Sequence, residues 1–121
     1  MRKIEEKIID CLKSCSENYS QRKSLSPRDS VGISKGSGYV SLWGHCIFTV
    51  DRKGNVKFSF QGWQTNTTKS RIDALLSAFC SAGIYQKNHR LVFSSSVGEF
   101  PIDADKIYTI KNGKPEEVES I

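Results

Sequence analysis

A strand is predicted to end and a helix to begin within Gln61-Gly62-Trp63-Gln64-Thr65-Asn66-Thr67-Thr68-Lys69-Ser70-Arg71. Before it, Val56, Phe58 and Phe60 alternate with polar residues, which is the period of a half-buried strand. After it, apolar residues recur at helical spacing over residues 68–82, and Gly83 is placed to end that helix. The segment therefore predicts an α+β fold, in which this helix packs against an antiparallel sheet.

The start of this helix is a candidate anion site. Threonines and an asparagine at residues 65–68 offer N-caps, and Lys69 and Arg71 follow at once. The free N–H groups and the dipole of a helix start attract anions, whereas cations there oppose the dipole unless a group such as a phosphate lies opposite. The alternative is a well-capped surface helix whose lysine and arginine are solvated.

Length and composition are those of one ordinary globular domain. The chain has 121 residues, of which 37% are hydrophobic and 26% charged, and this supports a modest core. No run approaches the roughly 18 consecutive apolar residues of a membrane span. The first residues are too acidic for the apolar region of a signal peptide, so we expect a cytoplasmic protein without a membrane partner.

The net charge of +5 is unevenly spread. Residues 1–90 carry 15 lysines and arginines against 7 aspartates and glutamates, whereas residues 91–121 carry 3 against 6. A basic body with an acidic tail indicates a polyanionic partner for the body, with the tail able to screen it.

The four cysteines argue against a metal site. Cys11, Cys15, Cys46 and Cys80 contain no C-x-x-C pair. Free cysteine most often acts as a small buried hydrophobe, so we expect reduced thiols near the core, no metal and no cofactor. A site formed by Cys11, Cys15 and a histidine is the alternative.

The chain is predicted to form one domain over residues 1–121. Residues 1–17 hold an amphipathic helix, from about residue 2, and the composition of residues 18–38 predicts a basic linker rich in serine and glycine. Residues 39–111 form the α+β core, and residues 112–121 an acidic, flexible tail. Within the core, strands are predicted at 39–51, 55–63, 84–86, 91–94 and 107–110.

A hairpin at about residues 39–63 forms the centre of the predicted sheet, with its turn at residues 51–55. If Val50 faces Val56, one face is uniformly apolar and belongs to the core. The opposite face then pairs Thr49 with Lys57, Ile47 with Ser59, His45 with Gln61, and Trp43 with Trp63. A bulge would shift this register.

This second face and the helix start together form the candidate ligand site. Rings that stack on bases and cations that hold phosphates are typical of surfaces that bind single-stranded nucleic acid. Two alternatives remain: the N-terminal helix covers the face, or the face is a protein interface, where tryptophan is also enriched. The candidate ligand-binding residues are Trp43, His45, Lys57, Gln61, Trp63, Thr67, Thr68, Lys69 and Arg71.

A resemblance adds to this interpretation. The runs Val40-Ser41-Leu42-Trp43-Gly44-His45-Cys46-Ile47 and Gly62-Trp63-Gln64-Thr65-Asn66-Thr67-Thr68-Lys69-Ser70-Arg71-Ile72 resemble a family of small tailed-bacteriophage proteins of unknown function. Its members share a strand hairpin, a G-W-x-T-x-T-T-K-x-R segment and a helix. The similarity covers residues 38–93 and implies a phage accessory protein acting inside a bacterium, with no activity that can be carried over.

Catalysis is not predicted, since neither histidine lies in a recognisable nucleophile context and no Gly-Lys-Ser/Thr loop precedes the helix. The predicted function is non-catalytic binding of nucleic acid or a phosphate-bearing nucleotide, in host takeover or in inhibition of bacterial immunity. The alternative is a protein–protein inhibitor that occludes a host defence or transcription complex, such as a CRISPR effector or polymerase, through the aromatic face or the N-terminal helix.

Overall fold

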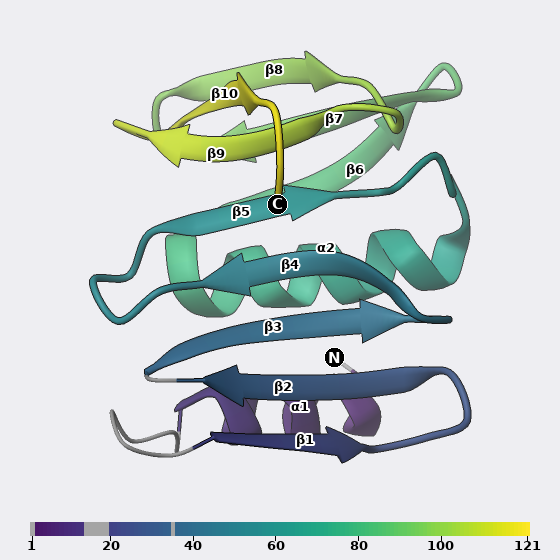
Figure 1. Ribbon diagram of the computed structural model, residues 1–121. Coiled ribbons are helices and arrows are strands. Elements are labelled where there is room, and N and C mark those ends of the chain that lie inside the picture. The colour runs from purple at the N-terminus through teal and green to yellow at the C-terminus, as the bar shows by residue number, and fades with distance from the viewer. Residues whose placement is uncertain (1, 14–19, 35) are drawn as a thin grey trace.

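The computed structural model describes residues 2–13, 20–34 and 36–121, and within them two helices and ten strands follow one another along the chain (Figure 1). The helices are α1 (Lys3–Lys13) and α2 (Asn66–Cys80). The strands are β1 (Ser20–Ser24), β2 (Asp29–Ser34), β3 (Ser37–Leu42), β4 (His45–Val50), β5 (Val56–Ser59), β6 (Gly83–Lys87), β7 (Arg90–Ser95), β8 (Gly98–Ile102), β9 (Ile107–Lys111) and β10 (Lys114–Val118).

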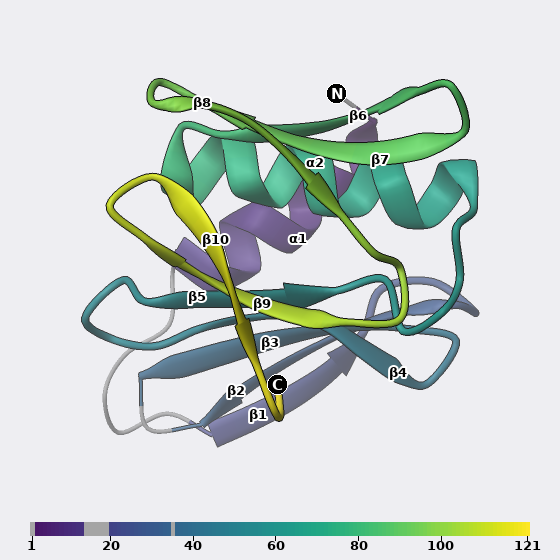
Figure 2. The same ribbon diagram turned by 90° about the horizontal axis from the view of Figure 1, so that it is seen from above.

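The strands form two antiparallel sheets. The large sheet has the order β1-β2-β3-β4-β5-β9-β10, and the small one has the order β6-β7-β8. The helices lie on one face of the large sheet, where α1 packs against β2 and β3 and α2 packs against β4 and β5 (Figure 2). The small sheet packs against β5 on that same face, where the ring of Phe93 from β7 stacks on that of Phe58 (Figure 2). The predicted α+β class is therefore confirmed.

The predicted pairing of Val50 with Val56, and the register of the hairpin next to it, agrees with the structure. Val50 pairs with Val56 and Phe48 with Phe58 across the β4–β5 hairpin, and these four side chains are buried in the core. The second helix begins two residues earlier than predicted. It ends at a left-handed Ser81 rather than at Gly83. The amphipathic helix α1 is described as far as Lys13, whereas its predicted continuation over residues 14–17, and with it Cys15, lies outside the described residues.

The prediction of a linker at residues 18–38 is wrong, because β1 and β2 occupy much of it. In β2, Val31 and Ile33 are buried under α1, and the serines of this strand alternate with them. The serine content therefore marks the polar side of a strand. Gly32 has a packing role, since a Cβ there would overlap the Tyr39 ring.

The predicted single strand over residues 39–51 is instead two strands, β3 and β4, joined by the two-residue turn Trp43-Gly44. Both turn residues have positive φ, 54° and 80°, as a type I′ hairpin requires. A tryptophan is uncommon at such a position, which is why the sequence did not indicate a turn. The predicted cross-strand pairing of Trp43 with Trp63 is therefore wrong.

The predicted flexible tail is also wrong for Lys114–Val118, which pairs with β9 as strand β10. Its acidic residues meet lysines: Glu117 lies 3.4 Å from Lys106 and Glu116 lies 3.6 Å from Lys111. These exposed ion pairs contribute little to stability individually. They do, however, pair the acidic side chains that were expected to screen the basic body with lysines of the same region. Strand β8 was not predicted, because a proline and a glutamate interrupt its apolar pattern.

Candidate ligand-binding cleft

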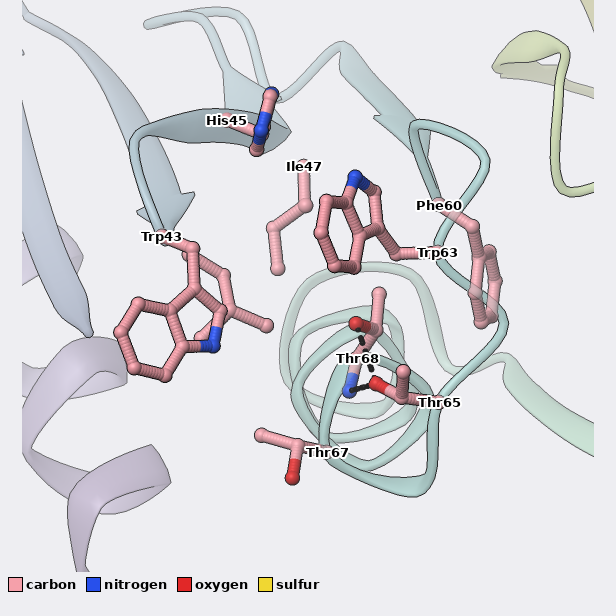
Figure 3. A pocket seen from close by; sticks show the side chains of 9 residues that line it. Trp43, His45, Ile47, Phe60, Trp63, Thr65, Thr67 and Thr68 are labelled. Atoms are coloured by element: carbon pink, nitrogen blue, oxygen red, sulfur yellow. Dashed lines mark hydrogen bonds between the residues drawn. The ribbon is translucent and has the colours of Figure 1, made fainter.

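An apolar cleft of about 190 Å³ opens where the β3–β4 turn, the loop after β5 and the start of α2 meet (Figure 3). Its volume is comparable with that of a cavity of about 150 Å³ that accepts a benzene ring, so one planar ring fits. The lining side chains are Leu42, Trp43, His45, Ile47, Phe60, Trp63, Thr65, Thr67 and Thr68.

Two exposed tryptophans flank this cleft. Trp43 is 62% exposed and Trp63 is 52% exposed, and the imidazole of His45 lies 5.7 Å from the Trp63 ring, measured between centroids. The helix α1 packs against α2, β2 and β3 instead of against these rings. The alternative in which the N-terminal helix covers the tryptophans is therefore wrong.

A β-bulge determines which side chains of β4 reach the cleft. Val40 pairs with Phe48 and Ser41 pairs with Cys46, so Ile47 is an extra residue without a partner in the ladder. Both Ile47 and Phe48 are consequently buried. Beyond the bulge the alternation is reversed, and His45 lines the cleft together with Ile47. Its predicted pairing with Gln61 is absent from the described ladders.

The floor of the cleft is the capped start of α2. Thr65 is the N-cap, and its Oγ1 accepts a hydrogen bond from the Thr68 N–H at 3.1 Å. The hydroxyls of Thr65 and Thr68 also share a hydrogen bond of 2.9 Å (Figure 3). Thr67 lines the cleft without belonging to this cap, and Lys69 follows on the first turn, partly exposed.

Arg71, predicted to bind the ligand, is a structural residue. Its side chain is 2% exposed and lies 2.7 Å from Glu5 of α1 and 2.8 Å from Asp29 of β2. Burial opposes the charge, but hydrogen bonds to Asp29 and Glu5 outweigh burial and raise the pKa of Arg71. The guanidinium therefore neutralises buried carboxylates, and its assignment to an anion site at the helix start is corrected.

Lys57 and Gln61, two further predicted site residues, do not line the cleft. Lys57 pairs with Thr49 and Thr109 in the large sheet and is absent from the cleft lining. Gln61 donates its side-chain N–H to the Cys46 carbonyl at 2.8 Å, and so fixes the loop that leads to Trp63. The structure thus brings together Trp43, His45, Trp63, Thr67 and Thr68, with Lys69 nearby, and separates Lys57, Gln61 and Arg71 from them.

Two turns outside the predicted site are tied to the tryptophans. The Trp43 N–H donates to the Arg28 carbonyl at 2.8 Å, and the Gln64 side chain donates to the His89 carbonyl at 3.1 Å. Arg28 and the His89-Arg90 pair are far from the tryptophans in sequence, and no local pattern indicates the approach.

In the part of the chain that the structure describes, no group of three or more His, Cys, Asp or Glu side chains is placed to hold a metal ion. Cys46 and Cys80 are partly buried thiols outside any disulfide, and burial raises the pKa of Cys46, and that of Cys80 to about 11. Among the described helices, none is long and apolar enough to cross a membrane.

Comparison with known proteins assigns this chain to a family. No curated protein and no solved structure matches this chain. A family model, described as Kyanoviridae Gp96 protein, matches residues 1–112. That match includes both helices and all the residues of the cleft, and the chain therefore belongs to this family of phage proteins.

Proposed function

We propose that this phage protein is a non-catalytic binding protein whose cleft holds an unpaired base of a single-stranded nucleic acid or of a phosphate-bearing nucleotide. The observation that carries the proposal is the pair of exposed tryptophans, Trp43 and Trp63, on an apolar cleft that fits one planar ring. Indole faces stack on bases of any sequence, and each stack contributes about 1–3 kcal/mol to binding.

The conformation of Trp43 supports a binding role. A bulky residue with positive φ is strained, by roughly 1–2 kcal/mol, and Trp43 also leaves most of its ring in solvent. Asparagine followed by Gly44 would suit the turn better. A side chain that lowers folding stability in two ways at a ligand-sized cleft is typical of a site where strain accompanies function.

The helix start supports the phosphate part of the proposal. Thr67 and the N-terminal turn of α2 form the floor of the cleft, and the positive end of the helix dipole favours an anion there. A phosphate attached to a base in the cleft would lie close to this turn, with Lys69 on the same turn. The setting that we propose is the bacterial cytoplasm during host takeover, including inhibition of bacterial immunity by capture of nucleic acids or nucleotide signals.

A protein partner is the second candidate, and one observation favours it. The cleft lining is largely apolar, and two of the three cations predicted for the site, Lys57 and Arg71, lie elsewhere. Exposed tryptophans in an apolar hollow are also typical of the hot spots of protein–protein interfaces. The protein would then occlude a host defence or transcription complex through this end of the molecule.

Tryptophan fluorescence tests the proposal, because Trp43 and Trp63 are the two tryptophans of the chain. Titration with oligothymidylate and with nucleoside monophosphates should quench the emission, and affinity for the oligomer should fall log-linearly with salt. Trp63→Ala should weaken binding by about 1–3 kcal/mol. Val97→Ala is the matched control, since Val97 is also 52% exposed but does not line the cleft.

Absence of quenching by every nucleic-acid and nucleotide ligand would contradict the proposal. Salt-insensitive binding of a host protein, lost in Trp63→Ala, would then establish the second candidate, since an aromatic interface depends far less on counterion release.

A further inference from the structure

Two further hollows adjoin the tryptophan cleft at the same end of the molecule. One, of about 390 Å³, lies beside the β3–β4 turn and is lined by Arg22, Arg28 and Gly44 among others. The other, of about 290 Å³, lies beside the loop after β5 and is lined by Gln64, His89 and Arg90 among others. Gly44 follows Trp43 and Gln64 follows Trp63, so each outer hollow includes the residue next to one tryptophan of the central cleft.

Hydrogen bonds hold these three hollows in a fixed order. The Trp43 N–H is bonded to the Arg28 carbonyl, which ties the first tryptophan to the β1–β2 turn. The Gln64 side chain is bonded to the His89 carbonyl, which ties the second tryptophan to the β6–β7 turn. Both turns lie at the end of the molecule where α2 begins (Figures 1 and 2).

Each outer hollow also carries an exposed arginine. Arg28 is 47% exposed, and its Nε lies 3.9 Å from Asp29, a carboxylate that Arg71 also holds at 2.8 Å. In the other hollow Arg90 is exposed, and Asp103 lies 3.6 Å from Lys106, which also pairs with Glu117 at 3.4 Å. An apolar, aromatic centre thus lies between two hollows that each present an exposed arginine.

We infer that the natural ligand is a strand of single-stranded nucleic acid and not a mononucleotide. Bases stack on Trp43 and Trp63, and the phosphates on either side contact Arg28 and Arg90. A mononucleotide fills only the central cleft and leaves both arginines without a ligand. This inference rests on the proposed function and adds to it the class of ligand and two residues that hold the backbone.

The test compares thymidine monophosphate with oligothymidylates of two, four, eight and twelve nucleotides, titrated into the full chain. Affinity should rise with length and then reach a plateau. The double variant Arg28→Ala/Arg90→Ala should bind the plateau oligomer about 10- to 100-fold more weakly, from roughly three- to tenfold per charged group removed. Its salt slope should fall by about 0.7 for each phosphate that the variant no longer neutralises, while its affinity for the monophosphate should not change.

The charge-matched control is Lys53→Ala/Lys114→Ala, because these exposed lysines lie in and beside turns at the opposite end of the molecule (Figure 2). Circular dichroism confirms that both double variants are folded. Equal affinity for monophosphate and oligomers, or an equal decrease of affinity in the two double variants, would overturn the strand inference while the binding of a base stands. Failure of every ligand to bind would overturn the strand inference and the proposed function together.

Discussion

The first two turns of α2 border two regions of opposite character. On one side Arg71 lies in the interior with Glu5 and Asp29, so that charged groups are buried and paired. On the other side Trp43 and Trp63 stand in solvent, so that the two largest apolar side chains of the protein are exposed. Residues six positions apart along α2, Thr65 at its cap and Arg71, belong to these two regions.

The difference separates side chains that hold the fold from those that we propose to bind a ligand. Every polar atom of the interior group can be accounted for: Ser70 donates to Glu5 at 2.6 Å and Ser26 to Asp29 at 2.7 Å, and among the described residues no buried side-chain N or O atom lacks a partner. A fully satisfied buried network orients elements, here α1 against α2 and β2. The tryptophans are more than half exposed in the free protein, and we propose that they serve an external ligand.

The largest effect is expected from removal of the buried cation. Arg71→Ala leaves Glu5 and Asp29 buried without their countercharge, which should lower the free energy of unfolding by about 3–5 kcal/mol. Urea denaturation measures this decrease. Lys69→Ala, two residues earlier and partly exposed, is the control and should change stability by less than about 1 kcal/mol. Similar values for the two variants would show that the interior charge group does not hold the helices.

A second comparison uses the two aromatic residues on the loop after β5. Phe60→Ala removes a ring that is buried in the core and should cost about 3–5 kcal/mol of stability. Trp63→Ala, three residues later, removes an exposed ring and should cost less than about 1 kcal/mol. A destabilisation by Trp63→Ala as large as that by Phe60→Ala would mean that the tryptophan is a packing residue.

A gain of stability is expected at Trp43. Trp43→Asn creates Asn-Gly at the β3–β4 turn, the pair that a type I′ hairpin favours, and should raise the free energy of unfolding by about 0.5–1 kcal/mol. The same variant should bind oligothymidylate more weakly. Thermal melts and the fluorescence titration measure the two effects. If Trp43→Asn is less stable than the parent but binds oligothymidylate normally, Trp43 serves the fold and not the ligand.

The smallest effect concerns pH and the thiol of Cys80. Its ordinary pKa is 9.0, and burial raises the pKa of the folded thiol to about 11. The folded state therefore retains a proton that the unfolded chain loses, so the stability contribution is complete below pH 9 and declines as pH rises from 9 to 11. Denaturation at pH 8 and pH 10 should show a smaller decline for Cys80→Ala than for the parent. An identical decline would show that the thiol is not desolvated.

The elements that were predicted correctly are those determined by residues close together in the sequence. Alternation at Val56, Phe58 and Phe60 predicted β5 and its buried face, and the threonines before α2 predicted its cap. The β3–β4 turn was missed because Trp43 adopts a conformation that tryptophan seldom takes. The register beyond it was missed because a one-residue bulge at Ile47 reverses the alternation and leaves no mark in composition.

The candidate site was partly predictable for the same reason. Trp63, Thr67 and Thr68 are close in sequence, and their proximity follows from one loop and one cap. The role of Arg71 was not predictable, because its partners Glu5 and Asp29 are more than 40 residues away in sequence. Arg28 and Arg90 reach the tryptophans only through the β1–β2 and β6–β7 turns, which no local pattern connects to them.

The indole N–H signals of Trp43 and Trp63 report whether an unpaired base enters the cleft between the two tryptophans. A ¹H–¹⁵N spectrum of the labelled protein should contain two indole resonances, one from Trp43 and one from Trp63. Titration with oligothymidylate should shift both resonances and the amide of Thr67 at the floor of the cleft. If both indole signals stay in place while the oligomer is present at saturating concentration, or if shifts appear only around Lys53 at the opposite end, the cleft is not the ligand site.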